Sequence, residues 1–185
     1  MSKRDALRAL SRKFPAPQEV KSILEGLRDE PDRVVAIVGS AIAESFLERA
    51  IVSRLRYQGP ELIGQLFNNR GPMADFHSKI LIAQAFGVVM PPQASEFHRI
   101  KVIRNVFAHA SLHITFETDE IAKEVDDFIM HKAMKKQMDI EFEKHGMDIP
   151  ELSRKSTFLL MVQLSCIVID HEQKEITGRF LGHYD

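Results

Sequence analysis

The sequence predicts an all-α fold, a compact multi-helix bundle built around one long central helix. Apolar side chains recur at helical spacing in several segments, and proline or glycine clusters separate these segments by short connections. Hydrophobic residues make up 44% of the 185 residues and charged residues 28%, as in ordinary folded proteins. We expect at most a short extended segment near residues 112–116, where apolar and polar side chains alternate.

The expected helices follow one another with breaks at proline and glycine, which end helices for steric and entropic reasons. They span residues 3–13, 18–28, 33–56, 61–67, 73–86, 93–109, 119–136 and 153–171. We expect residues 1–136 to form a helical core and residues 137–152, which are polar and contain Gly146 and Pro150, to form a linker. Residues 153–185 then supply a C-terminal helix and tail that pack on the core or on a partner.

The segment 33–56 is apolar around most of its circumference, which is typical of a central helix. At about 100° per residue, Ile37 and Ile51 lie within roughly 20° of Glu44. An ionised carboxylate inside an apolar stripe needs a cation or several hydrogen-bond donors. The sequence therefore predicts a cation from another helix beside Glu44.

The charge balance, with 25 basic and 26 acidic residues, argues against a protein that binds nucleic acid mainly through phosphates. DNA or RNA binding would need a local basic patch. The single cysteine, Cys166, cannot form an internal disulfide and is expected as a small buried hydrophobe. The longest apolar run, 158–169, is too short to cross a membrane, and no apolar signal core follows the N-terminus. We expect a cytoplasmic protein with no membrane association.

The most informative segment contains Arg104, Asn105 and His109. On a straight helix with Ile100 at zero, Arg104 lies near 40°, whereas Asn105, His109 and His98 lie between about 140° and 180°. We expect Arg104 to face the interior and form a structural ion pair with Glu44. Asn105, His109 and His98 form a separate stripe of candidate binding residues.

Three stretches together resemble the bacterial mannitol-repressor family. They are residues 97–109 (FHRIKVIRNVFAH), residues 71–80 (GPMADFHSKI) continuing to Val89, and the helix that runs from Asp32 through Glu44 and Glu48. The resemblance covers about residues 30–130. It implies a helical, non-catalytic regulator of sugar-alcohol operons that lacks a recognised DNA-reading motif. Such a regulator acts mainly through protein partners, and we expect a protein partner or a homodimer.

A broader resemblance offers an alternative of another class. An arginine, a polar residue and a histidine at this spacing mark the HEPN helical domains, many of which cut RNA without a metal. The resemblance implies that His109 moves a proton while Arg104 stabilises the phosphate, with Asn105 beside them. The angular separation of Arg104 and His109 argues against this alternative on one straight helix.

Metal and cofactor binding are not expected. His109 and His113 are four residues apart, a spacing that can hold a metal on a helix, but no fixed third ligand is evident. We expect no cofactor, and the resemblance to the mannitol-repressor family implies a non-catalytic regulator.

Overall fold

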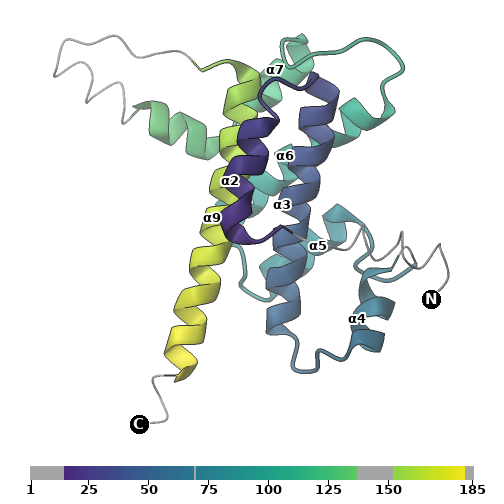
Figure 1. The fold of residues 1–185 in the computed structure, drawn as a ribbon, viewed down its shortest axis with the longest axis vertical. Coiled ribbons are helices and arrows are strands. Elements are labelled where there is room, and N and C mark those ends of the chain that lie inside the picture. The colour runs from purple at the N-terminus through teal and green to yellow at the C-terminus, as the bar shows by residue number, and fades with distance from the viewer. Residues whose placement is uncertain (1–14, 69, 137–151, 182–185) are drawn as a thin grey trace.

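The computed structural model describes residues 15–68, 70–136 and 152–181, and within these ranges it contains helices and no strand (Figure 1). The all-α fold class is confirmed. The named helices are α2 (Pro17–Gly26), α3 (Asp32–Arg54), α4 (Pro60–Phe67), α5 (Phe76–Ala85), α6 (Pro91–His109), α7 (Asp119–Asp126) and α9 (Arg154–Leu181). The expected helix 3–13 and most of the expected linker 137–152 lie outside the described residues.

Helix α3 is the centre of the bundle, as its apolar circumference predicts. It packs against α9, α6 and α5, while α2 lies along α9 (Figure 1). The close approach of α3 and α9 depends on Gly39, because a Cβ there would lie 3.2 Å from the Phe158 ring. The C-terminal helix therefore packs on the core.

Three aromatic rings pack together where the end of α6, the loop that follows it and the beginning of α9 meet. The ring centroids of Phe107 and Phe116 are 5.0 Å apart, and those of Phe116 and Phe158 are 5.1 Å apart. All three side chains are buried. They fasten the end of α6 and the following loop to the beginning of α9.

The segment 112–116 forms an irregular loop rather than an extended strand. Side chains satisfy several of its backbone groups. The Phe116 amide donates to Asp32 at 2.9 Å, and Arg33 donates to the carbonyl oxygens of Ala110 and Leu112. These hydrogen bonds with side chains at the start of α3 satisfy backbone groups that, in a strand, would bond to a neighbouring strand.

The single helix expected over residues 119–136 is wrong, because α7 ends at Asp126 and a second helix starts at residue 129. Phe128 is fully buried at the break. The carboxylate of Glu96 on α6 accepts a hydrogen bond from the Ile129 amide at 2.8 Å. This partner satisfies one of the amides that a new helix leaves unpaired at its start.

Helix α9 begins at Arg154 and continues to Leu181, ten residues beyond the expected end at residue 171. Its apolar buried residues, among them Phe158, Val162 and Ile169, follow helical spacing against the core. In the described ranges, no helix is both long enough and apolar enough to span a membrane.

Candidate functional site

Four charged side chains from three helices meet where α3, α5 and α6 pack together. Glu44 and Glu48 lie one turn apart on the same face of α3. Lys79 of α5 lies 2.8 Å from Glu44 Oε1 and 2.8 Å from Glu48 Oε2. Arg104 of α6 lies 3.6 Å from Glu44 Oε2. We call these four residues the charge cluster.

Lys79 is the buried cation of the charge cluster, with only 5% of the residue exposed. Its ammonium lies 5.9 Å from the centre of the Phe67 ring, a distance at which a cation is attracted to an aromatic face. Burial opposes its charged form, but the two carboxylates outweigh burial and hold the pKa of Lys79 above its ordinary value. Lys79 therefore remains charged and ties α5 to α3.

Arg104 lies beside Glu44, as the sequence analysis expects, but at the edge of the protein. Its side chain is 35% exposed, so the expectation of an inward-facing arginine is only partly met. The distance to Glu44 is too long for a hydrogen bond. Lys79 occupies the buried side of the same carboxylate, which leaves Arg104 on the solvent side.

Lys79 is the structural cation of this cluster that the sequence patterns did not predict. Its position in the sequence could have indicated burial, because Lys79 lies within one helical turn of Phe76, Ile80 and Ala83, all of which are buried. A lysine among such neighbours needs an acidic partner, just as Glu44 needs a basic one.

Asn105 and His109 are exposed, and His109 is the last residue of α6. Because the helix continues through His109, the separation of about 140° between Arg104 and His109 persists. The structure therefore does not bring these two side chains together within one chain. His98 lies on the same stripe as Asn105 and is half-buried next to His77 of α5.

Two cavities lie away from these residues. One, of about 320 Å³, is lined by Pro31, Asp32, Arg33, His113, Ile114 and Thr115. In it, Asp32 pairs with Lys155 at 2.9 Å and Arg33 bonds to the 110–112 loop. The other, of about 150 Å³, lies between α2 and α9 and is lined by four leucines and four polar or charged residues. In both cavities, the polar groups with identified partners serve the packing of neighbouring segments.

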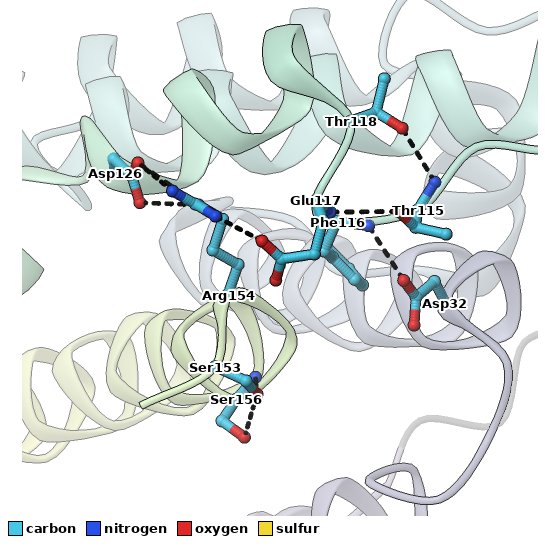
Figure 2. A network of polar contacts seen from close by, with 9 residues as sticks. All are labelled: Asp32, Thr115, Phe116, Glu117, Thr118, Asp126, Ser153, Arg154 and Ser156. Carbon is cyan, nitrogen blue, oxygen red and sulfur yellow. Dashed lines mark hydrogen bonds and ion pairs between the residues drawn. The ribbon is translucent and has the colours of Figure 1, made fainter. Parts of the chain in front are cut away.

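A polar network fastens the beginning of α9 to the end of α7 and to the loop before α7 (Figure 2). Arg154 donates to both carboxylate oxygens of Asp126, with Nη2 at 3.0 Å from Oδ2, and also to Glu117. These carboxylates raise the pKa of Arg154 further above its ordinary value. Because each charged group in this network has a partner in the fold, we assign the network to structure.

An apolar surface with basic neighbours lies on α3 and α6. Val34, Ile37 and Val38 of α3 are each 36–37% exposed, and Leu112 is 78% exposed. Arg33 brings Leu112 to the start of α3 by bonding to its carbonyl oxygen. Three cations on the same two packed helices are Arg33 of α3 and Lys101 and Arg104 of α6. We call these seven residues the α3–α6 face.

The α3–α6 face has no uncompensated acid from its two helices. Glu96 is the only acidic residue in α6, and it is buried. On α3, Lys79 and Arg104 together balance Glu44 and Glu48, while Lys155 pairs with Asp32. The face therefore combines exposed β-branched side chains with a local excess of positive charge, from Arg33 and Lys101, in a protein of net charge −1.

Comparisons of the chain with protein-family models, with curated proteins and with solved structures find no match.

Proposed function

We propose that the chain is a non-catalytic cytoplasmic regulator of mannitol-repressor type that acts through a protein partner. The observation that carries the proposal is the placement of Arg104. Its guanidinium contributes to a charge cluster that joins helices, and it lies about 140° around α6 from His109. Because of this angular separation, Arg104 does not lie beside the histidine of the same chain for phosphate chemistry.

The α3–α6 face is the docking surface in this proposal, and its partner is an acidic amphipathic helix. Exposed apolar side chains grouped on one face are typical of protein interaction sites. The cations Arg33, Lys101 and Arg104 at its margin attract a partner that carries carboxylates beside its apolar stripe. Such a helix would bury its apolar residues against α3 and pair its acids with α6.

Charge distinguishes this partner from two other occupants. A second copy of the chain would bring the same cations toward one another, which costs free energy in a symmetric interface. A nucleic acid would gain three phosphate contacts at most from the three cations and nothing from Val34, Ile37 and Val38. An acidic helix uses both the charges and the apolar side chains.

A complementation experiment in the host tests the proposal. A strain that lacks the gene receives wild-type protein, Val38→Asp or Lys101→Glu, and its transcripts are compared. We expect the transcripts of both variant strains to resemble those of the deletion strain. Each substitution places an acidic side chain opposite the acidic side chains of the partner, and like charges repel. Leu81→Asp, at a 49% exposed site on α5, is the control and should behave as wild type.

The alternative ribonuclease is tested with purified protein and RNA in excess EDTA. We expect no cleavage above a buffer control, and we expect His109→Ala to complement the deletion strain fully. RNA cleavage that disappears in His109→Ala would overturn the proposal. Deletion-like transcripts in the His109→Ala strain would also overturn it.

A further inference from the structure

His77 on α5 and His98 on α6 face one another across adjacent helices. Their ring centroids are 5.3 Å apart, and the ring planes are inclined by 47°. His77 is exposed and His98 is half-buried, so the pair is open to solvent on one side. We propose that this pair binds a divalent first-row transition metal ion such as Zn²⁺ or Ni²⁺ and bridges α5 to α6.

The spacing of the rings is that of two ligands on one metal ion. A Zn–N bond of about 2.0–2.1 Å places the metal roughly 3.2 Å from the centre of each imidazole ring. At a tetrahedral angle between the two bonds, the ring centres are then about 5.2 Å apart. The observed 5.3 Å agrees with this value, so the two rings are already as far apart as two ligands of one ion.

The form of histidine that binds a metal is the neutral imidazole, which offers one ring nitrogen as a ligand. Neither imidazole forms an ion pair with a carboxylate of the described residues. Asp75, two residues before His77, accepts hydrogen bonds from the amide and hydroxyl of Ser78, and Glu96, two residues before His98, accepts one from the Ile129 amide.

The donor set indicates which ions bind and how. Imidazole nitrogens favour Zn²⁺, Ni²⁺ and Cu²⁺, whereas Mg²⁺ and Ca²⁺ prefer oxygen ligands. In the part of the chain that the structure describes, no group of three or more histidine, cysteine, aspartate or glutamate side chains could hold a metal. Water therefore completes the coordination, and the site keeps positions open for an outside ligand.

Calorimetric titration of the full chain, without a polyhistidine tag, with ZnCl₂ and with NiCl₂ tests the site. We expect one ion per chain and a melting temperature that rises with metal concentration, because the ion binds the folded arrangement of the two rings. His77→Ala should weaken binding by at least about tenfold, because it removes one of the two protein ligands. His98→Asn should do the same, and His113→Ala is the matched control.

The exposed position of His77 means that His77→Ala should fold, which circular dichroism checks. Binding that is unchanged in both His77→Ala and His98→Asn would overturn the proposal, as would the absence of heat at millimolar metal. An equal loss in His113→Ala would place the ion elsewhere and also overturn it. The site stands on the ring geometry alone, so its failure leaves the docking surface on α3 and α6 unaffected.

Discussion

The ammonium of Lys79 lies 2.8 Å from Oε1 of Glu44, whereas the Arg104 guanidinium lies 3.6 Å from the other oxygen of the same carboxylate. Lys79 is buried and also reaches Glu48, while Arg104 is partly exposed. Removing a buried ion leaves its partner charges uncompensated, but solvent can replace an exposed ion. The two cations of the charge cluster should therefore differ widely in their contribution to stability.

Lys79→Met should lower the free energy of unfolding by about 3–5 kcal/mol, the usual cost of breaking a buried ion pair. Methionine fills much of the lysine volume, so most of the loss comes from Glu44 and Glu48 without their nearest cation. Urea unfolding at neutral pH, followed by circular dichroism, measures the change.

Arg104→Met is the matched control and should cost no more than about 1 kcal/mol, since Lys79 still compensates Glu44. Both variants replace a cation of the same cluster with the same side chain. Equal losses in the two variants would contradict the assignment of Lys79 as the main structural cation.

The fold could be predicted from the sequence because helical spacing and proline or glycine breaks are local signals. Helix α6, for example, was expected over 93–109 and is found over Pro91–His109. The break near residue 127 could not be predicted in this way. It depends on the carboxylate of Glu96, which is far away in sequence and bonds to the Ile129 amide. Periodicity contains no information about such a contact.

The site was predictable in part, for a similar reason. The position of Glu44 in an apolar stripe indicated a cation from another helix, and Arg104 is found beside it. Helical angles cannot say which of two helices supplies the closer cation, because that depends on how α5 and α6 pack on α3. The pairing of His77 with His98 depends on the same packing and was not foreseen.

Glu96 should make the stability of the protein depend on pH. Burial raises the pKa of Glu96 above its ordinary value, although the Ile129 amide and Arg99 favour the carboxylate. As pH rises, the unfolded chain loses this proton near the ordinary pKa, and the folded chain loses it only at higher pH. Between the two values the folded state binds more protons, so this group's contribution to stability falls as pH rises.

Glu96→Gln removes the ionisation but keeps an oxygen for the Ile129 amide. The variant should therefore gain stability relative to wild type as pH increases from about 4.5 to about 7. Urea midpoints of both proteins across this range measure the difference. Glu120→Gln, at an exposed acid on α7, is the control. A difference between Glu96→Gln and wild type that stays constant with pH would rule out the titration of Glu96.

Arg154→Ala should loosen the connection between α9 and the loop before α7. The arginine bonds to Asp126 and Glu117, which lie on the far side of this junction (Figure 2). Without it, amide hydrogens at residues 115–118 and in the first turn of α9 should exchange faster, while those in the middle of α3 should not change. Hydrogen exchange followed by mass spectrometry measures both regions. Uniform acceleration across the chain would instead indicate global destabilisation.

Cys166 should be unreactive in the folded protein. The thiol is buried in α9, and burial raises its pKa to about 12. The thiolate is the form that reacts with a disulfide reagent. At pH 8 the folded protein has little thiolate at Cys166, and the reagent cannot reach the buried sulfur. The reaction should therefore be at least about 100-fold slower than in the unfolded chain. The absorbance of the released aromatic thiol, followed with and without urea, measures the two rates. Rapid reaction without urea would show that α9 opens at Cys166 under native conditions, and would contradict the packing of α9 against α3.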